Sequence, residues 1–234
     1  MIKSLLPKKL KLVLRLIGKL LLDVRKGYIF CFAKKRKKAP TYTNKIQLTQ
    51  TLKSNPAKSH NLQIAMKAIE SVTIRPNEIF SFWKIVGKPT KEKGYKESRS
   101  IINNSIADSI GGGLCQLSGL VYYLSLIFNL EIIERYNHSM DIYTEETRFT
   151  PLGSDATVAY GYKDLRIKNN LKNPIRFFFL IEEEMLSIEL HHIDKLKRQE
   201  VLFKQKVLNE SQIEVDTIIK GTIVDTSIYK RTKN

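Results

Sequence analysis

The first 38 residues have the pattern of a helix with one narrow polar stripe. Residues 10–24 are apolar except at Lys11, Arg15, Lys19 and Asp23, which are spaced four apart. On a helix this spacing places all four side chains on one face. An aromatic patch at 28–33 and a basic run at 34–38 follow. We therefore expect residues 1–38 to form a basic amphipathic N-terminal arm.

Two interpretations of this arm differ in its partner. It holds 13 Lys or Arg and one acid, Asp23, so most of the net charge of +17 lies there. Its apolar runs fall far short of the ~20 residues of a membrane span, and it lacks a signal-peptide pattern. A helix bound to an anionic membrane surface fits this composition, with the side of the membrane undetermined. The alternative is a helix packed on the domain, with a solvated charge run. We expect no specific nucleic-acid binding, because no recognition motif accompanies the basic charge.

The next segments predict helices and a few short strands. Residues 39–58 are polar, with Pro40 and Pro56, and indicate a linker. The pattern predicts a helix over 60–72, a strand over 79–83 and another over 98–103, followed by a hairpin turn at 103–105. Residues 114–128 are almost all apolar or small and follow three glycines. A run apolar on all sides indicates a helix buried in the core.

Short β segments dominate the second half of the chain. Expected strands cover 131–136, 156–160, 165–168, 175–181, 185–191, 213–218 and 221–225. The predicted fold class is α+β: N-terminal helices, one buried central helix after a glycine-rich loop, and a mostly antiparallel sheet in the C-terminal half. Beyond the arm (1–38) and the linker (39–58), we expect one domain at 59–193 and a C-terminal β extension at 194–234.

The glycine run before the buried helix is the strongest chemical signal. Gly111, Gly112 and Gly113 lead into Leu114, Cys115 and Gln116. Backbone N–H groups at a helix N-terminus lack intrahelical acceptors and favour an anion. A cysteine there has a lowered thiol pKa, and the same N–H groups are suited to stabilise an oxyanion. Cys115 is therefore the candidate nucleophile, and a small buried packing residue is the alternative.

A cysteine nucleophile needs a base, and His138 is the candidate. It follows a predicted strand and enters a polar loop. Either Asp155 or Asn137 is suited to orient its imidazole. Gln116 has a side-chain amide that is a candidate oxyanion donor. The scattered histidines give no metal-ligand spacing, and no nucleotide-binding motif follows the glycines, so we expect neither metal nor cofactor.

Six motifs, in order, resemble the VanW family of bacterial proteins associated with vancomycin-resistance gene clusters. The resemblance covers about half of the chain. The motifs are 77–83 (NEIFSFW), Gly87, 94–97 (GYKE), 111–116 (GGGLCQ), 134–139 (ERYNHS) and 155–161 (DATVAYG).

The resemblance implies a cell-wall function. Some family members are L,D-transpeptidases whose nucleophile is the cysteine of the glycine-rich motif. By this resemblance, Cys115 forms a thioester with a peptidoglycan stem peptide or precursor, His138 acts as base, and Gly113 and Gln116 lie near the oxyanion. We therefore expect a cysteine-dependent acyl transferase. One alternative is a noncatalytic module that binds a cell-wall precursor or glycopeptide at the membrane surface, and another is a membrane-attached scaffold.

Overall fold

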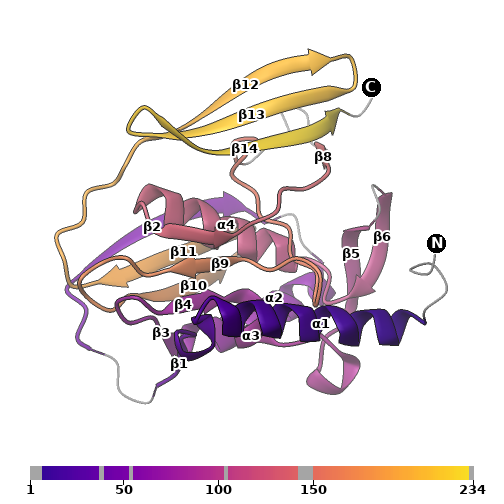
Figure 1. Ribbon diagram of the computed structural model, residues 1–234, viewed down its shortest axis with the longest axis horizontal. Helices are drawn as coiled ribbons and strands as arrows, with labels where there is room; N and C mark the ends of the chain where they lie inside the picture. Colours follow the sequence, from indigo (N-terminus) through magenta and orange to yellow (C-terminus); the bar gives the residue numbers. More distant parts are fainter. Residues whose placement is uncertain (1–6, 37–39, 53–54, 103–104, 142–149, 232–234) are drawn as a thin grey trace.

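The computed structural model describes residues 7–36, 40–52, 55–102, 105–141 and 150–231 (Figure 1). Its helices are α1 (Lys8–Arg25), η2 (Tyr28–Phe30), α2 (Pro56–Glu70), α3 (Phe82–Val86), η3 (Lys91–Lys93) and α4 (Leu114–Ile127). The strands before α4 are β1 (Lys34–Lys35), β2 (Asn44–Thr51), β3 (Val72–Thr73), β4 (Ile79–Ser81), β5 (Glu97–Ile102) and β6 (Ser105–Ile110). Those after it are β7 (Glu131–Glu134), β8 (Met140–Asp141), β9 (Arg166–Lys168), β10 (Arg176–Glu182), β11 (Met185–His192), β12 (Val201–Asn209), β13 (Gln212–Ile219) and β14 (Thr222–Arg231).

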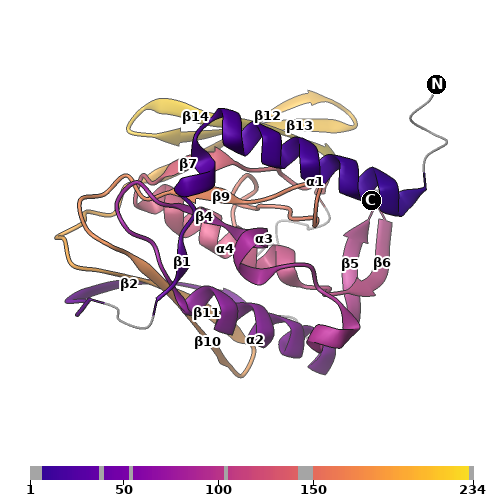
Figure 2. The same ribbon diagram turned by 60° about the horizontal axis from the view of Figure 1, so that its bottom comes forward.

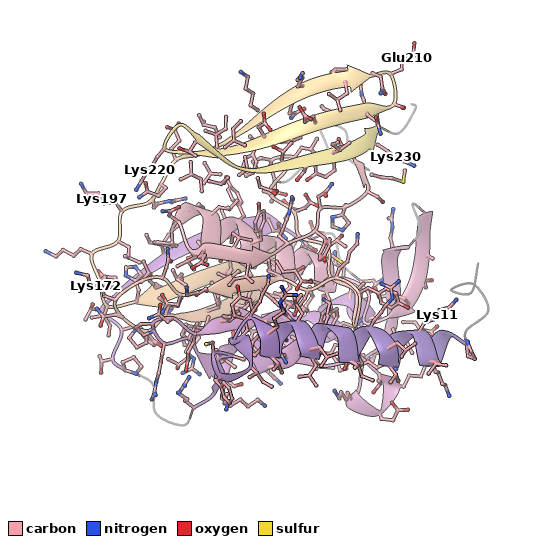
Figure 3. The ribbon with its side chains drawn as sticks, in the orientation of Figure 1. Lys11, Lys172, Lys197, Glu210, Lys220 and Lys230 are labelled. Atoms are coloured by element: carbon pink, nitrogen blue, oxygen red, sulfur yellow. The ribbon has the colours of Figure 1, made fainter. Side chains whose placement is uncertain are left out.

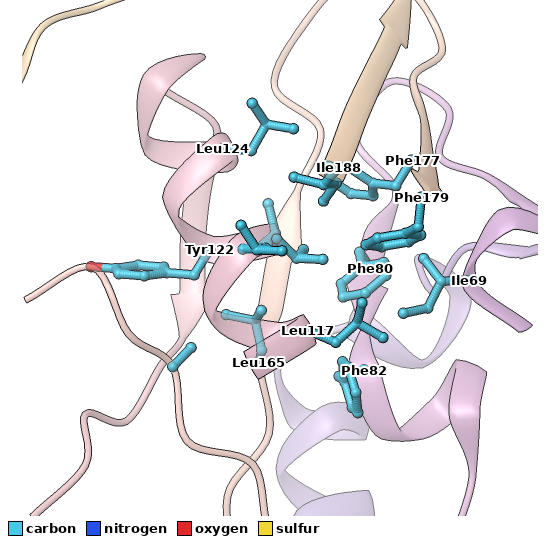
Figure 4. Packing of buried hydrophobic residues seen from close by; sticks show 14 of the residues in the cluster. Ile69, Phe80, Phe82, Leu117, Tyr122, Leu124, Leu165, Phe177, Phe179 and Ile188 are labelled. Atoms are coloured by element: carbon cyan, nitrogen blue, oxygen red, sulfur yellow. The ribbon is translucent and has the colours of Figure 1, made fainter. Parts of the chain in front are cut away.

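The main core lies between α4, α2 and the β10–β11–β2 sheet. Leu117 and Leu120 of α4 are almost fully buried, as are Phe177 and Ile188 on β10 and β11. Figure 4 shows Leu117 close to the aromatic rings of Phe80 and Phe82, which belong to the same core. The burial of α4 confirms the central helix expected over 114–128. The predicted α+β class, with antiparallel strands in the C-terminal half, is also confirmed.

The segment expected to be a linker, 39–58, contains a strand. β2 pairs antiparallel with β11 over eight residue pairs, from Thr51↔Met185 to Asn44↔His192. Only Ile46 and Leu48 give an apolar alternation within β2, and the intervening Lys, Gln and Thr side chains obscure it in the sequence. The linker prediction is wrong here because β11, about 140 positions later in the chain, supplies the hydrogen bonds that order the segment.

Two local predictions near the site also need correction. The strand expected over 79–83 stops at Ser81, whose hydroxyl accepts a hydrogen bond from Lys84 N and caps α3. Residues 156–160, expected to be a strand, form an extended segment with one isolated bridge, Ala159↔Lys163. Ser118 Oγ on α4 donates to Ala156 O, so a helix side chain satisfies a backbone carbonyl that would otherwise pair with a neighbouring strand. The turn predicted at 103–105 falls mainly on 103–104, outside the described residues.

The C-terminal extension forms a separate sheet over one side of the molecule (Figure 1). Its order is β12–β13–β14–β8, and β14 pairs parallel with β8 from the middle of the chain. A small apolar cluster joins Val215 and Tyr229 of this sheet to Leu152. The extension therefore packs against the segments that lead into and out of 142–149.

Helix α1 lies along the body (Figures 1 and 2). Its charged stripe contacts the body. Asp23 is 1% exposed and accepts a 2.6 Å hydrogen bond from Arg166 Nη1. Lys19 Nζ contacts Glu134 Oε1 at 2.8 Å, and the Arg15 guanidinium lies 4.3 Å from the Tyr162 ring centre. None of the described helices combines the length and the apolar character needed to cross a membrane.

Candidate active site

Three glycines form a tight loop that delivers the chain to α4. Gly111 and Gly113 have φ of +80° and +98°, a conformation that L side chains rarely adopt. A Cβ at Gly112 would overlap the carbonyl of Ser98, so β5 approaches the loop too closely for any side chain there. The Asn61 side chain, fully buried, donates to Gly112 O at 3.1 Å and to Lys96 O at 3.0 Å. The loop is thus held from two sides.

Cys115 is the second residue of α4, is half-buried and lines a large cleft. Gly113 caps the helix, which places the Cys115 sulfur in its first turn, at the positive end of the helix dipole. The cleft has a volume of about 820 Å³ and is also lined by His138, Asp155 and Tyr229. Cys115 Sγ lies 3.7 Å from Val158 O. The thiol is therefore accessible from a cavity large enough for a peptide segment.

His138 and Asp155 form the polar wall beside this thiol. His138 Nδ1 lies 2.6 Å from Asp155 Oδ2, and the His138 backbone N–H donates to the same oxygen at 2.6 Å. Since Nδ1 contacts the carboxylate, Nε2 is the ring nitrogen left to interact with the Cys115 thiol, which lines the same cleft. The arrangement is that of a catalytic triad: Cys115 is in the place of the nucleophile, His138 in that of the base, and Asp155 in that of the residue that orients the base.

Two further side chains hold the Asp155 carboxylate. Arg135 Nη2 donates to Asp155 Oδ1 at 3.0 Å, and Arg135 Nε donates to the Asp155 carbonyl at 2.8 Å. Tyr229 Oη donates to the same Oδ1 at 2.5 Å. Arg135 itself is anchored on β14, through Asp225 Oδ2 at 2.7 Å and through Ser227 Oγ. The carboxylate is consequently fixed in position on both of its oxygens.

Packing on α4 sets the distance between the acid and the thiol. Ser118 Oγ donates to Ala156 O at 2.6 Å, and Gly119 faces the backbone of Asp155 and Ala156. A Cβ at Gly119 would lie 3.6 Å from Ala156 N. The segment from Asp155 to Val158 therefore lies directly against the helix that carries Cys115.

The environment changes the proton affinities of all three groups. Burial alone would raise the pKa of the Cys115 thiol, but the hydrogen bond and charge of His138 outweigh it and lower the pKa. Burial would likewise lower the pKa of His138, but hydrogen bonds to Asp155 and Cys115 raise it well above its usual value. The pKa of Asp155 falls to about 2, because His138 and Arg135 outweigh the effect of burial. These directions favour a thiolate–imidazolium pair.

Two sequence-predicted site residues have other contacts. Gln116 Nε2 donates to Thr51 O at 3.1 Å, so its amide N–H ties α4 to β2. Asn137 Nδ2 donates to His138 O and Ile228 O, both at 2.8 Å. Of the two alternatives for orienting the imidazole, the structure brings Asp155 and not Asn137 to Nδ1. Across the described ranges, no cluster of three His, Cys, Asp or Glu side chains is placed to hold a metal ion.

Sequence reasoning missed Arg135, Tyr229 and Asn61. Arg135 lies within the ERYNHS motif, three positions before the candidate base, and this place in the motif was the one available signal. Tyr229 lies 74 positions after Asp155, in a strand pattern with no local mark of a site. Asn61 is one polar residue on an otherwise apolar helix face, a pattern that did not single it out.

Comparison with known proteins agrees with the motif analysis. A family model described as "VanW like protein" matches residues 57–191, more than half of the chain. "Uncharacterized protein YoaR" of Bacillus subtilis (strain 168) is 38% identical over 122 residues, which are 52% of this chain and 39% of that protein. "Vancomycin B-type resistance protein VanW" of Enterococcus faecalis (strain ATCC 700802 / V583) is 31% identical over 129 residues, 55% of this chain and 47% of that protein.

The matched region contains the candidate nucleophile, base and acid, while Tyr229 lies after it. The chain covers less than half the length of each of these two relatives. No solved structure matches the chain. On the family match and the ordered motifs, the chain belongs to the VanW-like family.

Proposed function

We propose that this protein is a cysteine-dependent acyl transferase, related to L,D-transpeptidases, that acts on peptidoglycan stem peptides or their precursors. The observation that carries the proposal is the grouping in one cleft of Cys115, at the N-terminus of a buried helix, with His138, whose Nδ1 is hydrogen-bonded to Asp155. The cell-wall substrate is supported by the name of one relative, a vancomycin B-type resistance protein. Vancomycin resistance concerns cell-wall precursors, so a peptide of that class is the candidate acyl donor.

In the proposed reaction, the Cys115 thiolate attacks an amide carbonyl carbon and forms a tetrahedral oxyanion. The first-turn N–H groups of α4, at Leu114 and Cys115, are candidate donors to this oxyanion. The C–N bond then breaks, and the His138 imidazolium gives its proton to the leaving amine. An incoming amine or water attacks the thioester, returns a proton to His138 and releases the thiolate. Asp155 holds the imidazole in one orientation throughout.

The test is to trap the acyl-enzyme. Purified protein is incubated with synthetic stem tetrapeptides and pentapeptides, and its intact mass is measured. We expect a hydroxylamine-sensitive adduct that Cys115→Ala abolishes. His138→Ala should slow its formation by about a hundredfold or more, the usual contribution of a general base. Cys31→Ser is the matched control, because Cys31 is the other cysteine and its Sγ contacts Gly27 O, away from the cleft.

Failure to form an adduct would contradict this proposal if the same peptides bind the protein. Equal binding by wild type and Cys115→Ser would then favour the noncatalytic binding module. Loss of binding on substitution at Gly112 or Gly113 would point in the same direction.

We further propose that α1 attaches the protein to an anionic membrane surface. Because its charged stripe contacts the body, its large apolar side chains face outward and are between 42% and 63% exposed. These residues are Leu10, Val13, Leu14, Ile17, Leu20, Leu21, Leu22 and Val24. Phe30, just after the helix, is 90% exposed.

Charge favours a lipid surface over a protein partner for this apolar face. Exposed Lys9 lies at one end of the helix, and exposed Arg25 and Lys26 lie at the other. Exposed Lys34 and Lys35 follow at the start of the basic run. Apolar side chains flanked by cations suit an interface of acyl chains and anionic headgroups. Trp83 and Tyr160 line both the cleft and a smaller pocket beside α1, so the attached helix would bring the site close to lipid-linked substrates.

Vesicle flotation tests this attachment. Wild type should float with vesicles that contain phosphatidylglycerol, less so at high salt, because headgroup attraction is screened. A Leu14→Ser, Ile17→Ser, Leu21→Ser variant should remain at the bottom of the gradient. The control changes three exposed apolar residues of the C-terminal sheet, Leu202, Ile223 and Val224, to serine and should float like wild type. Equal loss of flotation in both variants would contradict the proposal. So would a wild-type protein that does not float and instead forms a dimer that Leu21→Ser dissociates.

A further inference from the structure

One end of the cleft gathers side chains that donate hydrogen bonds or carry positive charge. Lys58 on α2 and Arg99 on β5 line this end, together with the glycine loop. The stem of Lys58 packs on the loop: its Cγ is 2.6 Å from where a Cβ at Gly113 would lie. Gly113 is two positions before Cys115, so this end of the cleft borders the candidate nucleophile.

Two buried donors in the same region have no acceptor within the described part of the chain. Gln50 is 4% exposed and Ser98 is 3% exposed, and both line the cleft. Gln50 Nε2 and Ser98 Oγ make no hydrogen bond to any described residue. A buried polar group without a partner destabilises the folded protein, because the hydrogen bonds that it made to water are not replaced. Native proteins therefore rarely retain such groups unless water, an ion or a ligand satisfies them.

The electrostatics of the cluster favour an anion. Burial and, to a smaller extent, the nearby charge of Arg99 together lower the pKa of Lys58 to about 8. Two cations held close together on a partly buried surface are stabilised when a negative charge binds between them. The N-terminus of α4 adds the positive end of its dipole on the same side. Two acids also line the cleft: Asp155 contacts Arg135 and His138, and Asp141 lies on β8.

We propose that Gln50, Lys58, Ser98 and Arg99 form a subsite that binds the free carboxylate of a short peptide acyl donor. The inference rests on the proposed function, because it orients an acyl donor whose carbonyl reaches Cys115. A carboxylate matches this set of donors. Its two oxygens can accept hydrogen bonds from the neutral amide and hydroxyl groups and from the two cationic side chains. The cleft would thus select peptides with a terminal or side-chain carboxylate close to the reacting carbonyl, over the corresponding amides.

Two alkylating peptides test whether the cleft prefers a carboxylate to the corresponding amide. N-bromoacetyl-alanine and N-bromoacetyl-alaninamide carry the same reactive group and differ only in the carboxylate. Saturation kinetics of Cys115 modification, in a Cys31→Ser background, give a dissociation constant and a maximal rate for each. We expect wild type to bind the acid more tightly than the amide. Lys58→Met should weaken binding of the acid about tenfold, the loss expected for one hydrogen bond to a charged group, and leave the amide unchanged.

The variants separate the subsite from general charge effects. Arg99→Met and Gln50→Leu should also reduce the preference for the acid, and Lys58→Arg should largely preserve it. Lys197→Met is the matched control, because Lys197 projects from the surface on the connection to the C-terminal sheet (Figure 3). Equal binding of acid and amide by wild type would overturn the proposal. So would a Lys58→Met effect of the same size on both probes.

Failure of the proposed function has a different signature. If both probes leave Cys115 unmodified, the nucleophile is wrong, and the subsite is then measured by calorimetry with N-acetyl-alanine and N-acetyl-alaninamide on Cys115→Ser. Tighter binding of the acid, lost in the additional Lys58→Met variant, would support the subsite without catalysis. Equal binding of the two would reject it.

Discussion

The state of the Cys115 thiol depends on residues that are far apart in the chain. Its own burial opposes ionisation, whereas His138, 23 positions later, favours the thiolate. Asp155 in turn favours the protonated imidazole, and Arg135 and Tyr229 hold Asp155 in place. Each group is stabilised in its charged form only while its neighbour is present, which makes single substitutions at this site informative.

The rate of Cys115 alkylation as a function of pH should show how far His138 controls ionisation of the thiol. In a Cys31→Ser background, the rate of Cys115 modification by iodoacetamide should rise with a midpoint below the ordinary pKa of a cysteine thiol. His138→Gln removes the two largest contributions that lower the pKa and leaves burial opposed only by the contacts to Val158 and Thr157, so the midpoint should rise. The same midpoint in both proteins would show that His138 does not control the thiol.

Acid unfolding should report on Asp155. Its pKa is about 2 in the folded protein, against 3.8 for an ordinary aspartate, so its stabilising effect is present above pH 3.8 and is lost as the pH falls through about 2. The Asp155→Asn variant has no carboxylate at this position, so its free energy of unfolding does not include this pH-dependent stabilisation. The difference in free energy of unfolding between wild type and Asp155→Asn should therefore narrow between about pH 4 and about pH 2, by up to about 2 kcal/mol.

Denaturant titrations over this pH range give both free energies. Asp164→Asn is the comparison: burial raises the pKa of Asp164, so its difference from wild type should not narrow in the same way. A constant difference for Asp155→Asn would contradict the lowered pKa of Asp155.

At the scale of elements, the junction between the glycine loop and α4 fixes the site. The loop requires positive φ at Gly111 and Gly113 and a missing Cβ at Gly112, and each requirement has a separate cause. The first two come from the turn into the helix. The third comes from the backbone of β5, which lies directly against Gly112.

Gly112→Ala should consequently destabilise the protein more than an ordinary glycine substitution. A methyl group at Gly112 meets the backbone at Ser98 and Arg99, so the loop or β5 must shift, at a cost of about 1–3 kcal/mol. Gly18→Ala is the control, because Gly18 lies within α1 with no atom within 4 Å of an added Cβ. It should be neutral or stabilise by about 0.5–1 kcal/mol. Thermal and denaturant unfolding measure both, and equal effects would contradict the close approach.

At the scale of the whole molecule, the C-terminal sheet completes the site. β14 contributes Tyr229, Asp225 and Ser227 to the network around Arg135 and Asp155. The family match ends at residue 191, before β12, β13 and β14 of this sheet. In this chain the sheet therefore acts as a positioning element for the candidate acid.

Tyr229→Phe should weaken the site while the fold is retained. Loss of its hydrogen bond to Asp155 should slow alkylation of Cys115 at neutral pH by about two- to tenfold, the range for one hydrogen bond. Because Tyr229 acts through Asp155 and His138, the midpoint of the alkylation profile should rise as well. Tyr162→Phe, which changes a partly exposed tyrosine beside α1, should leave both unchanged. An unaltered midpoint in Tyr229→Phe would assign this tyrosine a purely structural role.

The sequence by itself was sufficient for the elements whose signal is local. The apolar run after the glycines determined α4, because a helix apolar on all sides has to be buried. The motifs that include Cys115, His138 and Asp155 determined the family, and the four-residue spacing in α1 determined a helix with one polar stripe.

Only the tertiary structure decided how distant segments meet. It made β2 a strand through its pairing with β11, brought Asp155 and not Asn137 to the His138 ring, and added Tyr229 from β14. It also turned the charged stripe of α1 inward, because Asp23, Lys19 and Arg15 find partners on the body. Side-chain pairing across large sequence separations depends on packing and partner charge, and neither has a local pattern from which it could be predicted.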